Sequence, residues 1–429
     1  MKTLLKHGSI IAWENGPKEI RNGYLGIDGD KIIYIGKQKP EEVYDIEKDM
    51  TKKLLIPGLI NGHSHSPMTL LRGEGSELPL KQWLDCIVPI ENRMEAEDIR
   101  RGSQVAMLEM IAGGTTCFSD MYIMPEITIE EVCKAKMKAN VTRCIVSFDP
   151  KERAKDNFGV AESLKLFEDF NNYMDGRIKV DFSIHGEYTS TPGVIQEYSE
   201  MCEERKGRMH LHLSETPYEH KECIKRYGKT PTQWFYDLGT FNVPTQAAHG
   251  VMLTDNDLEL LKEKGVAVVH NPSSNMKLGS GFAPIKKMLE KGILLAMGTD
   301  GAASNNNLNM FEELHIASII HKGKEQDPTL LSPAELFTFA TRNGAKIQGR
   351  EDTGTLEVGK KADIVAVSLD RPHMVPNRDL LSTLIYSAQA QDVFMTMIDG
   401  EILYENGIYY TLDAEKIMFE FEKRIESLY

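Results

Sequence analysis

The amino-acid sequence predicts an α/β fold in which a (β/α)8 TIM-like barrel is joined to a small β-sandwich formed from both chain ends. Strand-then-helix units repeat eight times over roughly 290 residues, the number that such a barrel requires. Short strands with tight turns occupy the two ends instead. No Gly-x-Gly-x-x-Gly opens a strand–helix unit, which argues against a doubly wound open sheet. We expect residues 1–55 and 356–429 to form the β-sandwich and residues 56–355 to form the barrel.

The N-terminal segment has the pattern of hairpins, because Asn15-Gly16 and Asp28-Gly29 follow apolar stretches and such pairs favour tight turns. The strands expected at the two ends are Ser9–Trp13, Gly23–Ile27, Lys31–Gly36, Ala362–Val367, Val393–Ile398 and Glu401–Tyr404. Neither end has enough strands for a stable sheet of its own. We therefore expect the two ends to pair, and an amphipathic helix over Ala414–Leu428 to close the chain.

The middle of the chain alternates apolar strands with helices of 3.6-residue periodicity. The eight expected strands are the apolar run that ends at His63, then Thr115–Ser119, Val141–Phe148, Ile178–Ile184, Met209–Ser214, Gln246–Ala248, Val266–Val269 and Ile293–Gly298. Helical periodicity is visible between them, for example over Glu97–Ile111, Ala161–Tyr173 and Thr254–Glu263.

Composition argues against several classes of partner. The formal net charge is −14 and adjacent basic residues occur only as pairs, so a phosphate backbone is not an expected partner. The six cysteines have no Cys-x-x-Cys spacing and are expected as free thiols. The N-terminus lacks the apolar core of a signal peptide, and no stretch reaches the length of a membrane helix. We expect a cytoplasmic protein without nucleic-acid or membrane partners.

Polar residues collect at the C-terminal ends of the predicted strands, which is the face of a barrel where chemistry takes place. The residues at these ends are His63, His65, His185, His212, Glu215, His249, His270 and Asp300. Six of the twelve histidines are in this set, far more than random placement would give. His63 and His65 lie two residues apart, so their side chains point the same way in an extended strand. The sequence therefore predicts a site at this face.

The most economical set of metal ligands is His63, His65, His212 and Asp300. Three imidazoles and one carboxylate suit a divalent transition metal such as zinc or iron better than calcium or magnesium. A binuclear site would want a bridging ligand, often a modified lysine, on a middle strand. Residues 147–149 contain no lysine, and Lys179 lies at the wrong end of its strand. We expect one metal ion per subunit.

This set of residues predicts hydrolysis at a planar carbon–nitrogen centre. A bound cation lowers the pKa of water from about 15.7 toward about 7. The reaction also needs a base for the water proton and an acid for the leaving nitrogen. Asp300 is the expected base and Glu215 the expected proton carrier to a ring nitrogen. His249 is expected to polarise the attacking water or to stabilise the oxygen that becomes charged.

Several motifs resemble those of the amidohydrolase superfamily, in the same order along the chain. They are Pro57–Met68, His212–Thr216, Ala247–Gly250, His270–Asn275 and Gly298–Asn306. Within the superfamily the chain is most similar to the 5-methylthioadenosine/S-adenosylhomocysteine deaminases, which hydrolyse the 6-amino group of adenine nucleosides to give inosine analogues and ammonia. The resemblance implies a metal-dependent hydrolase barrel, an activity on carbon–nitrogen bonds of cyclic amidines, and zinc as the metal with iron as the alternative.

The resemblance also implies which residues bind the substrate. Glu91 would bind the ribose hydroxyls, Arg143 the far end of the substrate and His185 a purine nitrogen. Trp83 would line the pocket beside the 5′ substituent. The complete implied set is Glu91, Arg143, His185, Glu215, Asp300 and Trp83.

Other interpretations of four residues stay open. Trp83 is equally compatible with a core position, Glu91 with a helix cap and Arg143 with a structural ion pair. His270 is expected behind the ligands rather than on the metal.

One position departs from the family pattern. The family carries a second arginine that helps to bind the amino-acid end of S-adenosylhomocysteine, and alignment on Ser163–Leu166 places Gly159 there. Arg153 is nearby in sequence and is the candidate replacement. Substrates without a charged tail, such as methylthioadenosine, 5′-deoxyadenosine or adenosine, are therefore expected.

Two rival functions share part of this pattern. A related amidohydrolase that acts on guanine, a pterin or a substituted triazine would use nearly the same metal set, but a bare base has no ribose for Glu91 to hold. A non-catalytic relative would have lost metal ligands, and none is missing here. The His-x-Glu and Pro-Cys-x-x-Cys signature of zinc cytidine deaminases is absent. The expected partners are a small nucleoside substrate and further copies of the chain in a homo-oligomer.

Overall fold

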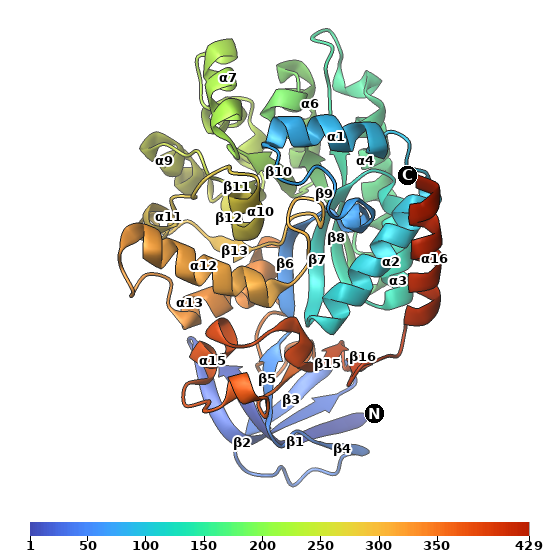
Figure 1. The fold of residues 1–429 in the computed structure, drawn as a ribbon, viewed down its shortest axis with the longest axis vertical. Helices are drawn as coiled ribbons and strands as arrows, with labels where there is room; N and C mark the ends of the chain where they lie inside the picture. The colour runs from blue at the N-terminus through green and yellow to red at the C-terminus, as the bar shows by residue number, and fades with distance from the viewer. Residues whose placement is uncertain (429) are drawn as a thin grey trace.

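The chain folds into a barrel that stands on a separate sheet, which contains strands from both ends of the sequence (Figure 1). The structure is a computed structural model that describes residues 1–428, so Tyr429, the last residue of the expected segment 356–429, lies outside the described part. The C-terminal helix α16 (Ala414–Leu428) has the predicted bounds and packs along α2 (Ala96–Ala112) at the side of the barrel.

Eight parallel strands form the barrel in chain order. Their bounds are β6 (Leu59–Ser64), β7 (Thr115–Tyr122), β8 (Lys138–Ile145), β9 (Ile178–Ile184), β10 (Met209–Leu213), β11 (Thr245–His249), β12 (Ala267–His270) and β13 (Leu295–Met297). All their residues except Arg143 and Lys179 are buried, as expected for parallel strands covered by helices. The Asp300 amide donates to the His63 carbonyl at 3.0 Å, which joins the end of β13 to β6. The predicted barrel of eight strands is confirmed.

The third barrel strand is shifted from its predicted position. The apolar stretch Val141–Phe148 suggested a strand to Phe148, but β8 ends at Ile145. The Ser147 amide instead donates to the Thr189 carbonyl at 2.9 Å, because the chain leaves the sheet there and turns over the end of the barrel. The apolar residue Phe148 is 72% exposed.

Helices surround the barrel, and α15 lies beside the end sheet (Figure 1). The remaining bounds are α1 (Leu80–Glu91), α3 (Pro125–Ala135), α4 (Phe158–Phe170), α5 (Tyr173–Gly176), α6 (Pro192–Glu204), α7 (Pro217–Tyr227), α8 (Pro231–Asp237), α9 (Asp255–Lys264), α10 (Pro272–Lys277), α11 (Ile285–Lys291), α12 (Met310–Glu325), α13 (Pro333–Thr338), α14 (Gly344–Ile347) and α15 (Leu380–Tyr386). The helices predicted from periodicity are present as α2, α4 and α9. Of these, α4 begins three residues early, because the Asn157 side chain accepts from the Val160 amide and caps it there. Across residues 1–428 no helix combines the length and the apolar character needed to cross a membrane.

The strands of the two chain ends form one nine-stranded sheet. Their bounds are β1 (Lys2–Trp13), β2 (Pro17–Asp28), β3 (Lys31–Gly36), β4 (Ile46–Asp49), β5 (Lys53–Pro57), β14 (Ile364–Ser368), β15 (Val393–Ile398), β16 (Glu401–Glu405) and β17 (Ile408–Tyr409). β5 lies between β1 and β14 and so joins the two halves. Apolar residues of both halves, including Leu25 and Met395, share one core. The predicted pairing of the chain ends is confirmed.

The chain passes from the sheet to the barrel at Gly58. Pro57 pairs with Ile364 in the sheet, and Leu59 begins β6 of the barrel. A Cβ at Gly58 would overlap the Thr116 side chain, so only glycine fits this close approach. The apolar run that ends at His63 is therefore two strands in two different sheets.

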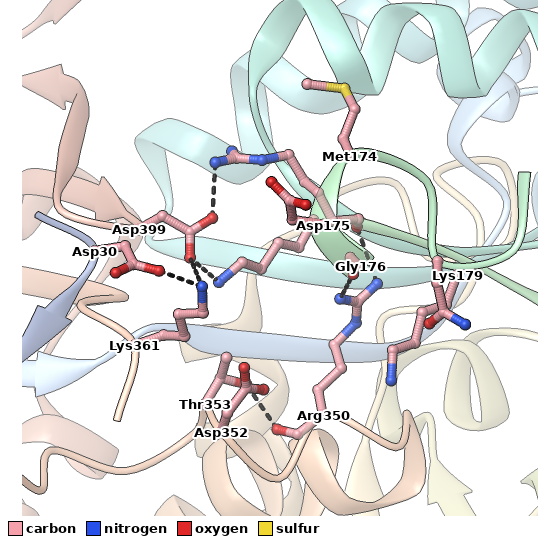
Figure 2. Close-up of a pocket in the computed structure, with 13 residues that line it drawn as sticks. Asp30, Met174, Asp175, Gly176, Lys179, Arg350, Asp352, Thr353, Lys361 and Asp399 are labelled. Atoms are coloured by element: carbon pink, nitrogen blue, oxygen red, sulfur yellow. Dashed lines mark hydrogen bonds and ion pairs between the residues drawn. The ribbon is translucent and has the colours of Figure 1, made fainter. Parts of the chain in front are cut away.

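A cluster of buried and partly buried charged residues connects the sheet to the N-terminal end of the barrel. Lys138 Nζ on β8 lies 2.8 Å from Asp363 Oδ2 and 2.6 Å from Asp399 Oδ1. Arg177 lies 2.7 Å from the other oxygen of Asp399. A cavity of about 810 Å³ adjoins this cluster, with Lys361 and Asp399 on one wall and Arg350 on another (Figure 2). This cavity is at the opposite end of the barrel from the residues predicted to be functional.

Candidate metal centre and active site

Five candidate ligand side chains meet at the C-terminal ends of the barrel strands. The donor atoms of His63, His212, His249 and Asp300 all lie within 4.8 Å of one another, and all four residues are buried. His65 joins them, because its Nε2 lies 3.2 Å from Asp300 Oδ1 and 3.3 Å from His212 Nε2. The structure thus contains a buried metal site. The four residues predicted as ligands lie together at this site, along with His249, which the sequence assigns to catalysis.

Backbone carbonyls orient two of the imidazoles. Nδ1 of His65 donates to the Met121 carbonyl at 2.6 Å, and Nδ1 of His212 donates to the His185 carbonyl at 2.7 Å. A carbonyl only accepts, so Nδ1 carries a proton in both rings, and Nε2 is the nitrogen that remains to bind a metal ion. Both Nε2 atoms face the shared centre, which is how proteins orient histidine ligands.

Side chains orient the other two imidazoles. Nδ1 of His63 lies 2.8 Å from Nε2 of His210, and Nδ1 of His249 lies 2.9 Å from Oδ1 of Asn275. Nε2 of His63 is buried and makes no hydrogen bond within residues 1–428, although it faces Asp300 Oδ1 at 3.3 Å. Unpaired nitrogen lone pairs around one carboxylate suit a divalent cation, so the residues present fit a metal ion.

Asp300 is held in its ionised form. Its Oδ2 accepts hydrogen bonds from Ser274 Oγ at 2.6 Å and from Ser304 Oγ at 2.8 Å, which leaves Oδ1 to face the imidazoles. Burial raises the pKa of Asp300, but the rings of His63 and His65 outweigh it and hold this pKa well below its ordinary value. Burial lowers the pKa of His63 to about 4, so this ring is neutral. A neutral imidazole beside an ionised carboxylate is the state in which both can ligate a metal.

The backbone is strained at three points of the site. Ser214, His249 and Asp300 have φ values of 49°, 74° and 63°, in the left-handed region that side chains other than glycine rarely adopt. Ser214 directly follows β10, His249 ends β11 and Asp300 lies three residues beyond the end of β13, where the chain must turn sharply. Such strain clusters where a fold holds functional groups in place.

Glu215 is a buried carboxyl group beside the cluster. Its Oε2 lies 3.8 Å from His249 Nε2, and Ser280 Oγ lies 3.5 Å from its Oε1. Burial raises the pKa of Glu215, and the neighbouring His249 acts in the opposite direction. A carboxyl group with a raised pKa next to a metal site suits proton transfer near neutral pH.

A hydrogen bond from Tyr122 connects Glu91 to the barrel. The Tyr122 hydroxyl at the end of β7 donates to Glu91 Oε1 at 2.6 Å, and the Tyr122 ring lies 6.5 Å from that of His65. Burial raises the pKa of Glu91, and the hydrogen bond from Tyr122 opposes this effect. The carboxylate that ends α1 therefore lies near the metal site.

Trp83 and His185 border the site in different ways. Trp83 is 5% exposed and belongs to an apolar cluster with Met68 and Tyr122, so its core position is observed. The His185 ring lies 4.9 Å from that of His212, and its Nδ1 lies 3.1 Å from Thr189 Oγ1. Burial lowers the pKa of His185 to about 4, so this ring is neutral.

Arg143 is already engaged by a carboxylate. Its Nε lies 2.7 Å from Glu162 Oε2 on α4, which is the ion pair that the sequence left open. A Cβ at Gly159 would lie 3.7 Å from Arg143 Nη2, so the position that carries an arginine in the family is adjacent to Arg143. Arg153, the candidate replacement, pairs with Glu197 and is mostly exposed.

Comparison with known proteins agrees with this geometry. The model of the amidohydrolase family matches residues 54–403, which is most of the chain. The chain belongs to the amidohydrolase family.

Relatives of this amidohydrolase match it over its whole length. The 5-methylthioadenosine/S-adenosylhomocysteine deaminase of Thermoanaerobacter pseudethanolicus is 42% identical, over 100% of this chain and 99% of its own. The 5′-deoxyadenosine deaminase of Methanosarcina acetivorans is 37% identical, over 99% and 98%. Among solved structures, an adenosine deaminase from Xanthomonas campestris with bound zinc superposes with a TM-score of 0.93, at 30% identity over 99% and 98% of the two chains.

Sequence reasoning missed several residues of this amidohydrolase that support the site. His210 orients His63, Asn275 orients His249, and Tyr122 binds Glu91. A signal for His210 was present, because His210-Leu211-His212 repeats the spacing of His63-Ser64-His65. His270 turns away from the cluster, and its Nε2 lies 2.9 Å from His321 Nε2.

Proposed function

We propose that this amidohydrolase is a metal-dependent deaminase that hydrolyses the 6-amino group of adenine nucleosides to give the inosine analogue and ammonia. The observation that carries the proposal is the convergence of four imidazole Nε2 atoms and the Asp300 carboxylate beside the buried carboxyl group of Glu215. The full-length relatives named as deaminases of methylthioadenosine, S-adenosylhomocysteine or 5′-deoxyadenosine support the substrate class.

The proposed metal ligands are His63, His65, His212 and Asp300, with zinc as the ion. Donors about 2.0–2.1 Å from one tetrahedral ion lie roughly 3.3 Å apart. The separations from Asp300 Oδ1 to Nε2 of His63 and of His65 are 3.3 and 3.2 Å, and that between His65 and His212 is 3.3 Å. When bound, the ion would act as a Lewis acid that activates water for attack on the carbon that bears the amino group.

The proton transfers are assigned to this chain's own carboxyl groups. Asp300 would accept the proton of the attacking water through Oδ1, while Ser274 and Ser304 hold Oδ2. Glu215, whose pKa is raised by burial, would deliver a proton to the ring nitrogen next to the reacting carbon. His249 would polarise the water, because its Nε2 faces both the metal site and Glu215.

The substrate would extend from this centre toward α1 and β8. Glu91 would accept hydrogen bonds from the ribose hydroxyls, His185 would contact the purine ring, and Trp83 would pack near the 5′ substituent. Arg143 would lie at the far end, where Glu162 already balances its charge. With Gly159 beside it, this end favours an uncharged tail, so methylthioadenosine, 5′-deoxyadenosine and adenosine are the proposed substrates ahead of S-adenosylhomocysteine.

An ammonia-release screen of the metal-loaded protein tests the proposal. The panel is adenosine, methylthioadenosine, 5′-deoxyadenosine, S-adenosylhomocysteine, guanine, a pterin and a substituted triazine. Turnover of adenine nucleosides is expected; turnover of guanine, the pterin or the triazine alone would favour the alternative of another amino-heterocycle. Glu215→Gln should retain the metal and lose nearly all ammonia release. The expected homo-oligomer stays a prediction, which light scattering would check.

A further inference from the structure

Glu219 on α7 is hydrogen-bonded to the backbone at Glu215 and the residue before it. Its Oε1 accepts from the Ser214 amide at 3.0 Å, and its Oε2 accepts from the Glu215 amide at 2.7 Å. Glu219 is 2% exposed, so both hydrogen bonds are shielded from water. Burial raises the pKa of Glu219 to about 8, and the hydrogen bonds from the two backbone amides act against this effect.

Helix capping alone does not account for this arrangement. Thr216 is the N-cap of α7 and Glu219 is the third helical residue, the Thr-x-x-Glu pattern of a capping box. In a capping box the acidic side chain returns to the amide of the N-cap residue, as Asp257 does to Thr254 at the start of α9. The carboxylate of Glu219 instead reaches one and two residues farther back, to the segment between β10 and the helix.

The segment that Glu219 holds is strained, and within residues 1–428 the Glu215 carboxyl group has only loose partners of its own. Ser214 has a left-handed φ of 49°. The partners of the Glu215 carboxylate, Ser280 Oγ and His249 Nε2, lie 3.5 and 3.8 Å away, at or beyond the limit of a hydrogen bond. The direction of Glu215 is therefore decided mainly by its backbone, which Glu219 holds through the two shorter contacts.

We infer that Glu219 is a positioning residue that fixes the Glu215 carboxyl group against His249 for proton transfer. The inference rests on the proposed function for its kinetic consequence, but its geometric consequence is independent of any activity. A misplacement of about 1 Å in a reacting group can reduce a rate by about 100-fold. Loss of the two hydrogen bonds to Glu219 should therefore lower kcat and leave KM nearly unchanged.

The test compares Glu219→Gln with Glu222→Gln on the same helix, where Glu222 pairs only loosely with Lys225 at 3.4 Å. In Glu219→Gln the amide nitrogen can no longer accept a backbone hydrogen bond, so kcat for methylthioadenosine should fall about 10- to 100-fold with KM within threefold of the wild type. Glu222→Gln should keep the kcat of the wild type. Glu219→Asp retains the carboxyl group at the helix N-terminus but is one methylene shorter, so kcat should fall to the same extent, and this variant serves as the test if Glu219→Gln does not fold.

Crystal structures of the three variants supply a readout that needs no turnover. In Glu219→Gln or Glu219→Asp the Glu215 carboxyl group should leave its position beside His249, while in Glu222→Gln it should stay. Unchanged kcat and an unchanged Glu215 position would overturn the inference. A wild type that releases no ammonia from any adenine nucleoside would overturn the proposed function instead and leave the structural comparison valid.

Discussion

Nε2 of His210 lies 2.8 Å from Nδ1 of His63, so one buried histidine orients another. Nε2 of His63 faces Asp300, which leaves its Nδ1 as the proton donor to His210. Burial holds the pKa of His210 well below its ordinary value, so His210 is a neutral acceptor. Residues that orient a metal ligand in this way typically change metal affinity by about 10- to 100-fold when they are replaced.

His210→Ala should therefore weaken metal binding by about 10- to 100-fold, measured by competition with a chelator of known affinity. His210→Gln supplies an amide oxygen as acceptor and should recover part of the loss. The matched control is His315→Ala, at a partly exposed histidine on α12. A His210→Ala protein that retains the metal as tightly as the wild type would show that His63 needs no such support.

Glu91→Ala tests the assignment of the ribose site. A hydrogen bond to a charged group contributes about 1.5–3 kcal/mol, so KM for methylthioadenosine should rise about 10- to 100-fold. Free adenine has no ribose, and its KM should barely change. An equal rise for adenosine and adenine would place Glu91 at the base instead.

The protonation of Glu91 gives a pH dependence. Burial raises the pKa of this carboxyl group from its ordinary value of 4.5. The protonated form accepts ribose hydrogen bonds poorly, so KM should be constant above the raised pKa and should increase as the pH falls through it. This increase should occur at a higher pH than an exposed glutamate would give.

Tyr122→Phe reports on the same titration. The hydroxyl of Tyr122 lowers the pKa of Glu91, so its removal should move the increase in KM to still higher pH. The measurement is KM for methylthioadenosine against pH in the two proteins. Identical profiles would show that Glu91 does not control nucleoside binding.

Lys138 connects the barrel to the end sheet through Asp363 and Asp399. Lys138→Met leaves the buried carboxylate of Asp363 and the partly buried carboxylate of Asp399 without this partner, which should lower the free energy of unfolding by about 3–5 kcal/mol in a denaturant titration. The control Lys136→Met breaks an exposed pair with Glu401 and should cost at most about 1 kcal/mol. Equal losses in the two variants would mean that burial adds nothing to the cluster.

The barrel and its candidate ligands could be predicted because they depend on local features of the sequence. These features are the alternation of side chains along a strand and the polar residues that follow each strand. The sequence did not predict contacts between segments that lie far apart along the chain. The polar core of the barrel, where His210 touches His63, and the partner of Arg143 depend on which strands and helices meet in space. The division of one apolar run at Gly58 depends on the close approach of Thr116, which no local pattern records.

Glu162 should control which 5′ substituent is accepted. It lies 2.7 Å from Arg143 Nε and balances the only charge proposed to meet the substrate's far end. Glu162→Gln removes the competing carboxylate, so the ratio of kcat/KM for S-adenosylhomocysteine to that for methylthioadenosine should rise, by about tenfold for each 1.4 kcal/mol of interaction that Arg143 gains.

The control for this change is Glu168→Gln on the same helix, which keeps the Arg143–Glu162 pair. The expected rise must come from a better kcat/KM for the charged substrate, since methylthioadenosine has no carboxylate for Arg143 to bind. Raised ionic strength should diminish the gain in Glu162→Gln, because a partly exposed ion pair is screened by salt. A ratio that does not change, or that rises only because methylthioadenosine turns over more slowly, would place Arg143 outside the substrate pocket.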